Sequence, residues 1–217
     1  MNTNDQFVVT ISREVGSGGH TVGKVLAEKL GVRFCDKDLI KALREKFNLS
    51  AYEIEQLKGE KKSWVSDFIR MVTPVPKATL LNDPGSAYIR EFRPDVDTDD
   101  IFKAESEILR EVASEGSCVI TGRSGFFILK DFPNIVNVFI TAPFEKRVER
   151  VMKKQEMNRD TAEIIVKEVD KMRENYIERY AATSRYDARN YDLVINMDGI
   201  TEEQAVNIIL DYIGCEK

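Results

Sequence analysis

The chain of 217 residues has few of the side chains that usually bind transition metals: one histidine, His20, and three cysteines. Cys35, Cys118 and Cys215 lie far apart, their number is odd, and their spacing is not that of metal ligands. A histidine-rich or cysteine-rich metal centre is therefore excluded. We expect all three thiols to be buried or incidental.

The sequence also lacks an excess of basic residues and a long apolar run. It has 32 Lys and Arg against 37 Asp and Glu, for a formal net charge of -5. Sequence-independent nucleic-acid binding usually requires a basic face, so nucleic acid is not an expected partner. No apolar run approaches the length that spans a membrane, and the N-terminal MNTNDQ lacks the apolar stretch of a signal peptide. We expect no membrane partner and a cytoplasmic location.

The remaining composition is that of a globular protein, with 42% hydrophobic and 32% charged residues. The length favours a single domain, 1–217, with a modest insertion. Short apolar runs predict five buried parallel strands, and helix patterns between them predict crossovers that cover both faces of the sheet. The runs are 7–11, 32–36, 118–121, 136–141 and 192–196.

Capping signals mark the ends of several helices. Gly31 is a C-terminal cap for the first helix, and Pro143 suits the first turn of another. Asp160 is expected to open a long helix that runs to about residue 181, and Thr201 with Gln204 forms a capping box. These signals place helices after the first, fourth and fifth strands.

Residues 37–100 separate the second and third strands. Apolar patterns predict short helices after Asp36, after Ser50 and around residues 65–72. The segment 73–97 is rich in proline and has no sustained period, so we expect an irregular insertion there.

A glycine-rich turn follows the first strand in the run TISREVGSGGHTVGKVLAEKLG, residues 10–31. Gly16, Gly18 and Gly19 let backbone N–H groups approach an anion closely, and the helix that follows presents its N-terminus to the same place. This pattern predicts a phosphate-binding loop. A tight turn with a purely structural role is the alternative.

The segment GSGGHTVGKVLAEKL resembles the phosphate loop and first helix of the cytidylate-kinase-like family, with Gly16, Gly18 and Thr21 on matching positions. The resemblance covers most of the chain. It implies a three-layer α/β P-loop kinase fold with a five-stranded parallel sheet. It also implies an acceptor-binding insertion at 37–100 and a helical lid at 147–189.

The resemblance implies that this loop binds the phosphates of ATP and that Thr21 helps to hold Mg²⁺. The implied donor-binding residues are Gly16, Ser17, Gly18, Gly19, His20 and Thr21.

The loop departs from the family at two positions. Cytidylate kinases have Lys where this chain has Gly19, and their first loop glycine corresponds to Arg13. Arg13 or His20 is a candidate to replace the missing cation beside the transferring phosphoryl group. For His20 the alternative is an exposed residue of the first helical turn.

Two further segments resemble the acceptor-binding parts of the family. FCDKDLI places Asp36 after the second strand, where it is either an acceptor contact or only a helix cap. ITGRSG places Arg123 at the carboxyl end of the third strand, where open α/β sheets bind ligands. Ser124 stands where cytidylate kinases have Asp, so the resemblance leaves cytosine selectivity open.

Three arginines match the lid of the family: Arg147 and Arg150, which share a helix face, and Arg173. Their guanidinium groups are suited to phosphate, although surface ion pairs or solvated helix faces are the alternatives.

The resulting hypothesis is Mg²⁺-dependent transfer of the ATP γ-phosphoryl group to a nucleoside monophosphate, CMP or dCMP first. The alternatives are a kinase of another small metabolite and a nucleotide-sensing module without turnover. A homo-oligomer is compatible with either.

Overall fold

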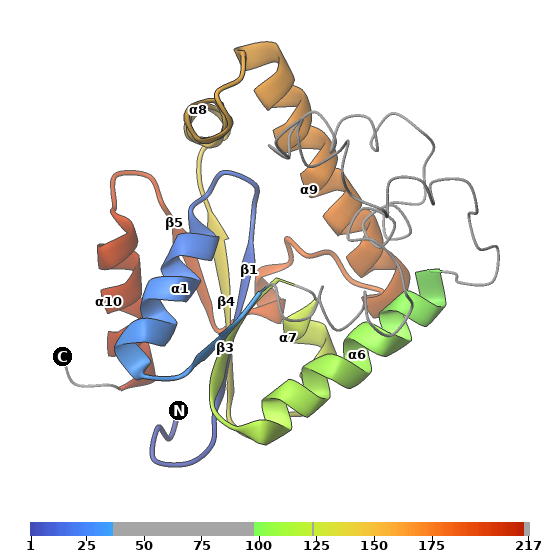
Figure 1. Ribbon diagram of the computed structural model, residues 1–217, viewed down its shortest axis with the longest axis vertical. Coiled ribbons are helices and arrows are strands. Elements are labelled where there is room, and N and C mark those ends of the chain that lie inside the picture. The colour runs from blue at the N-terminus through green and yellow to red at the C-terminus, as the bar shows by residue number, and fades with distance from the viewer. Residues whose placement is uncertain (37–97, 123, 215–217) are drawn as a thin grey trace, which may run out of the picture. The chain divides into compact units, whose positions relative to one another are not determined.

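The computed structural model describes residues 1–36, 98–122 and 124–214 (Figure 1). The chain forms two compact units, Met1–Leu39 with Glu105–Lys217, and Ile40–Ala104. The predicted helices and irregular stretch between residues 37 and 97 lie outside the described residues. The insertion at 37–100 therefore stays a prediction.

A five-stranded parallel sheet forms the centre of the first unit. Its strands follow the order β2-β3-β1-β4-β5, so β1 lies in the middle, between β3 and β4. The predicted α/β class and the parallel sheet are confirmed. The strands are β1 (Val8–Arg13), β2 (Arg33–Cys35), β3 (Cys118–Thr121), β4 (Ile135–Thr141) and β5 (Leu193–Asn196).

Helices cover both faces of this sheet (Figure 1). On one face, α1 (Gly19–Leu30) and α10 (Glu202–Ile213) enclose a core that includes Val22, Leu26 and Ile209, all fully buried. On the other face lie α7 (Gly125–Ile128) and the C-terminal part of α6 (Thr98–Glu115). Each fully buried aliphatic side chain contributes about 1.5–3 kcal/mol, and this packing fixes the carboxyl ends of the strands.

Helix α8 (Phe144–Gln155) lies beyond the carboxyl ends of the strands, and α9 (Arg159–Ala181) begins at the same end and runs down toward α6 (Figure 1). A short 3₁₀ helix, η2 (Ala188–Asn190), precedes β5. No helix among the described residues is long and apolar enough to cross a membrane.

The helix caps confirm part of the sequence analysis. Gly31 ends α1 with φ 65°, and its amide donates to Ala27 and Glu28 carbonyls. Thr201 and Gln204 form the predicted capping box of α10.

Two predicted helix starts are shifted. Pro143 is the N-cap of α8 and not part of its first turn. For α9 the cap is Asn158, whose side chain accepts from the Thr161 amide, so Asp160 is the second residue of the helix. Asn158 has the extended backbone that is typical of an N-cap residue, and its amide side chain is one of those that favour this position.

Two of the three thiols lie within the described residues; both are buried, and neither is part of a disulfide. Cys35 lies on β2 and Cys118 on the adjacent β3. The pKa of the Cys118 thiol is raised by its hydrogen bond with Cys35 and by burial. This fits the expected structural role for these two residues.

Candidate active site

The glycine-rich turn joins the end of β1 to the start of α1. The Glu14 amide donates to the carbonyl of Ile140 on β4 (3.1 Å), which ties the turn to the neighbouring strand. Both the amide and the hydroxyl of Ser17 donate to the Glu14 carbonyl, at 3.3 and 2.9 Å. Ser17 is buried, and its hydroxyl closes the turn.

Backbone conformation in this turn favours glycine at two positions. Gly16 has φ 78° and Gly18 has φ 91°, in the left-handed region that side chains rarely adopt. The first intrahelical bond of α1 runs from the Val22 amide to the Gly18 carbonyl (3.1 Å). The preceding amides of the helix therefore have no acceptor within it and are available to an anion.

The guanidinium of Arg150 lies beside Gly18 of this loop. A side-chain carbon placed at Gly18 would be 2.7 Å from Arg150 Nη1. Glu202, in the first turn of α10, forms an ion pair with the same Nη1. The Arg150 hydrogen bond lowers the pKa of the Glu202 carboxyl. Arg150 is thus held beside the amides where a phosphate chain would lie.

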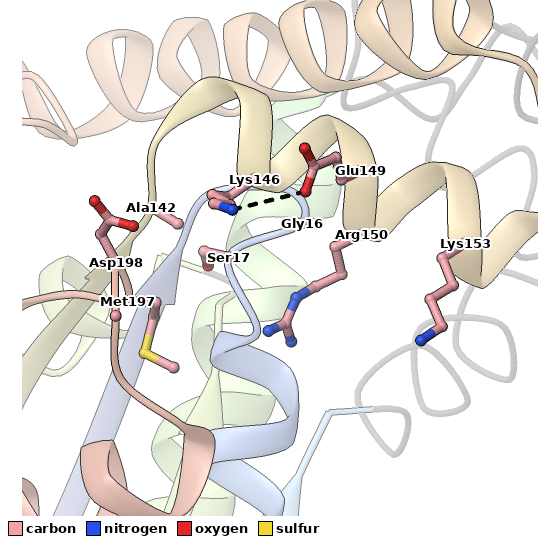
Figure 2. A pocket seen from close by; sticks show the side chains of 10 residues that line it. Gly16, Ser17, Ala142, Lys146, Glu149, Arg150, Lys153, Met197 and Asp198 are labelled. Atoms are coloured by element: carbon pink, nitrogen blue, oxygen red, sulfur yellow. Dashed lines mark ion pairs between the residues drawn. The ribbon is translucent and has the colours of Figure 1, made fainter.

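A cavity of about 410 Å³ adjoins the loop at Gly16 and Ser17 (Figure 2). Its other walls come from the end of β4, from α8 and from the loop after β5. Three cations and two carboxylates stand among the apolar groups, and Lys146 pairs with Glu149 at 3.9 Å. The charged lining residues are Lys146, Glu149, Arg150, Lys153 and Asp198.

Arg147 has a different environment from Arg150, although the two share one helix. Its side chain is buried, and Nη1 donates to Asp170 Oδ2 at 2.5 Å. Nη2 lies 3.4 Å from Glu14 Oε1, and Nε donates to the Ala142 carbonyl (3.1 Å). Arg147 therefore connects α8 to the loop and to α9. Its predicted contact with phosphate stays a prediction.

Asp170 connects α9 directly to the backbone of the loop. Its Oδ1 accepts from the Val15 amide at 3.0 Å. Arg185, which is also buried, lies 3.5 Å from this Oδ1, and its Nη2 donates to the Arg13 carbonyl at 2.5 Å. Arg173 donates to the same carbonyl at 3.3 Å. Two guanidinium groups thus meet at the last residue of β1.

The structure brings His20 and Asp36 together. His20 was predicted to contact the phosphoryl donor and Asp36 the acceptor. His20 Nε2 lies 2.9 Å from Asp36 Oδ2, and the ring packs edge-on against Phe34. Thr21, on the first turn of α1, is exposed. The ligand contacts predicted for all three stay predictions.

The second acceptor segment is described only in part. Arg123 lies outside the described residues. Next to it, Ser124 is buried and has φ 57°, ψ 23°, an uncommon conformation for a residue with a side chain. Its carbonyl accepts from the amides of Phe127 and Ile128, both at 2.9 Å, and so begins α7.

Comparison with known proteins agrees with this geometry. The sequence pattern of the cytidylate kinase-like family matches residues 8–199. This chain belongs to that family. A cytidylate kinase of Sulfolobus acidocaldarius is 23% identical over 208 residues, which cover 95% of this chain and 93% of that one.

Solved structures show the same architecture. An uncharacterized protein of Eubacterium ventriosum has a TM-score of 0.67 and 27% identity, over 97% of this chain and 99% of that one. A shikimate kinase of Bacteroides thetaiotaomicron has a TM-score of 0.55 and 16% identity over the same shares. The latter likeness shows the fold alone, which is the predicted P-loop kinase fold.

Sequence reasoning did not predict the contacts that attach the loop to α8 and α9. Glu14, Asp170 and Arg185 are far apart in the chain, and their types alone suggest surface ion pairs. The cavity residues Lys146 and Asp198 were missed as well. The only available signal was that each follows the carboxyl end of a predicted strand within a few residues.

Proposed function

We propose that this chain catalyses Mg²⁺-dependent transfer of the γ-phosphoryl group of ATP to a nucleoside monophosphate, with CMP or dCMP the first candidates. Family membership supports a phosphotransferase that uses ATP. The observation that carries the proposal is the convergence of the α1 N-terminus and Arg150 on one loop beside a cavity. Positioning and charge stabilisation are the main requirements of phosphoryl transfer, and no covalent intermediate is needed.

The donor nucleotide fits this arrangement with its phosphates on the loop and its nucleoside in the cavity. The cavity volume of about 410 Å³ is within the range of small-molecule sites, about 300–1,000 Å³. Lys146, Arg150 and Lys153 line the cavity and offset the charge of a triphosphate. The amides of the first turn of α1 supply neutral donors to the same oxygens.

The residues beside the loop are compatible with Mg²⁺, which takes oxygen ligands and keeps several waters. Thr21 offers an exposed hydroxyl on the first turn of α1, and Asp36 offers a carboxylate at the end of β2. A bound Mg²⁺ would neutralise charge on the β- and γ-phosphate oxygens. Thr21 and Asp36 would hold it or its waters.

The acceptor is assigned to the β2–β3 side of the sheet, opposite the cavity on the β4–β5 side. Asp36 follows β2, and Arg123 and Ser124 follow β3. Family membership favours a nucleoside monophosphate. Cytidylate kinases have Asp at the position of Ser124. Because of this difference, a kinase of another small metabolite is the second candidate.

ADP production measured across acceptors tests the proposal. The panel contains CMP, dCMP, UMP and AMP, with shikimate as a non-nucleotide comparison suggested by the shared fold. We expect the largest acceptor-dependent rate with CMP or dCMP. A higher rate with another metabolite would replace the acceptor, and ATP binding without transfer to any acceptor would favour a nucleotide-sensing module.

A further inference from the structure

The side chain of Arg13 lies between two glycines from different elements. A side-chain carbon at Gly19, the first residue of α1, would be 2.6 Å from Arg13 Cβ and 3.2 Å from Cγ. A side-chain carbon at Gly122, just after β3, would overlap Arg13 Nη1 and lie 3.2 Å from Nη2. The stem of Arg13 therefore occupies the space beside Gly19, and its guanidinium occupies the space beside Gly122.

Gly122 is held in this position by the sheet. Its amide donates to the Ile11 carbonyl at 2.8 Å, and its φ is 76°. Because β1 and β3 are adjacent, Arg13 at the end of β1 reaches across to the end of β3. The guanidinium is thus directed away from the cavity, which lies on the β4–β5 side, and toward the proposed acceptor side.

This position is the boundary between the two halves of the proposed site. Gly19 opens the helix whose N-terminus faces the donor phosphates, and Gly122 belongs to the segment next to the acceptor residues. A γ-phosphoryl group in transfer must pass between these two halves. A guanidinium has five N–H donors in a fixed plane and keeps its charge at all relevant pH values, so it can contact a donor and an acceptor oxygen together.

We propose that Arg13 is a catalytic residue that contacts the transferring phosphoryl group, in the role that a lysine at position 19 would otherwise have. The inference rests on the proposed function. Side chains at positions 13 and 19 compete for one space, so this chain carries the cation on the end of β1 and glycine at the start of α1. At Gly122 both the positive φ of 76° and the nearby guanidinium favour glycine.

The test compares the affinities of Mg·ATP and Mg·ADP by titration calorimetry, because only ATP presents the γ-phosphate. Arg13→Ala and the milder Arg13→Gln should lower the preference for ATP over ADP by about tenfold or more, the effect of one lost charged hydrogen bond. Arg110→Ala, which removes an exposed arginine of α6, is the charge-matched control and should keep the wild-type ratio.

Exchanging the residues at positions 13 and 19 tests whether their side chains compete for one space. Gly19→Lys alone should lower the melting temperature, since its Cβ would crowd Arg13. Arg13→Gly alone should lose the ATP preference. The double variant Arg13→Gly with Gly19→Lys should recover both stability and the ATP preference relative to the two single variants.

Several results would overturn the inference without touching the proposed function. These are an unchanged ATP/ADP ratio in Arg13→Ala and Arg13→Gln, a Gly19→Lys variant as stable as wild type, or equal wild-type affinity for ATP and ADP. A wild-type protein that binds neither nucleotide would instead contradict the proposed function itself.

Discussion

Gly16 is the residue of the loop with the least tolerance for a side chain. Its φ is 78°, and a Cβ there would overlap the backbone carbonyl of Arg147. The backbone of α8 cannot move away easily at this point, because the Arg147 side chain forms ion pairs with Glu14 and Asp170.

Gly16→Ala is therefore expected to destabilise the fold by about 1–3 kcal/mol and to weaken ATP binding. Urea unfolding and nucleotide titration measure the two effects. Gly116→Ala is the matched control, since no heavy atom lies within 4 Å of the Cβ it would add. Equal stability of the two variants would contradict the tight packing of the loop against α8.

For single residues, the sequence predicted the position on a helix better than the tertiary contacts of the side chain. The i, i+3 spacing placed Arg147 and Arg150 on one helix face, and both do lie on α8 near the loop. Their partners differ because Arg147 meets Glu14 and Asp170, which come from a distant turn and another helix. Such pairs follow from tertiary packing, which helical periodicity does not specify.

Among the elements, α9 is attached to the loop through the buried carboxylate of Asp170, in addition to Arg173. Asp170 is buried, pairs with Arg147, lies near Arg173 and Arg185, and accepts from the Val15 amide. Removal of this carboxylate leaves buried guanidinium groups with too little opposite charge.

Asp170→Ala should lower the free energy of unfolding by about 3–5 kcal/mol, and Asp170→Asn by less because its amide oxygen still accepts from Val15. Denaturant titration gives both values. Asp160→Ala, at an exposed position in the first turn of the same helix, should cost about 1 kcal/mol or less. An Asp170→Ala variant no less stable than Asp160→Ala would show that α9 is held by its other contacts.

The contact of α10 with α8 should depend on pH through Glu202. Arg150 lowers the pKa of this carboxyl below its ordinary value of 4.5. A lowered folded-state pKa stabilises the protein above the unfolded-state value, and this contribution disappears as the pH falls through the folded-state pKa.

The melting temperature of wild type should therefore exceed that of Glu202→Gln at neutral pH, and the gap should close in acid. Asp160→Asn, in the first turn of α9, controls for the loss of one exposed negative charge near a helix N-terminus. A gap that is constant from neutral to acidic pH would exclude the ion pair as its cause.

The five strands of the sheet were predicted from sequence to within a few residues, because buried parallel strands are short continuous apolar runs. The short helix α7 was not predicted, and the helices predicted between residues 37 and 72 lie outside the described residues. The order of the strands in the sheet was not predicted either, since apolar runs do not specify their neighbours. The cavity depends on that order: β4 and β5 bring residues 142–153 and 197–199 to the same side of the loop.

For the whole molecule, a net charge of -5 coexists with a cationic loop region. Arg13 ends β1, and Lys146, Arg150 and Lys153 line the cavity beside the loop. The attraction of an anionic ligand depends on the charge near the binding site and not on the net charge of the whole chain. The family match shows a member of a kinase-like family, and this local charge supports the proposed binding of ATP at the loop.

The most direct test of this account is the dissociation constant of Mg·ATP for wild type and for Gly18→Val, measured by titration calorimetry. Gly18 has φ 91° and lies against Arg150, so a valine there would displace both the amides and the guanidinium from the phosphates. Gly116→Val serves as the control, and melting temperatures verify that each variant is folded. The account predicts saturable binding by wild type and by Gly116→Val, and a loss of at least about tenfold in Gly18→Val. Absence of binding by wild type, or equal affinity in a folded Gly18→Val variant, would contradict it.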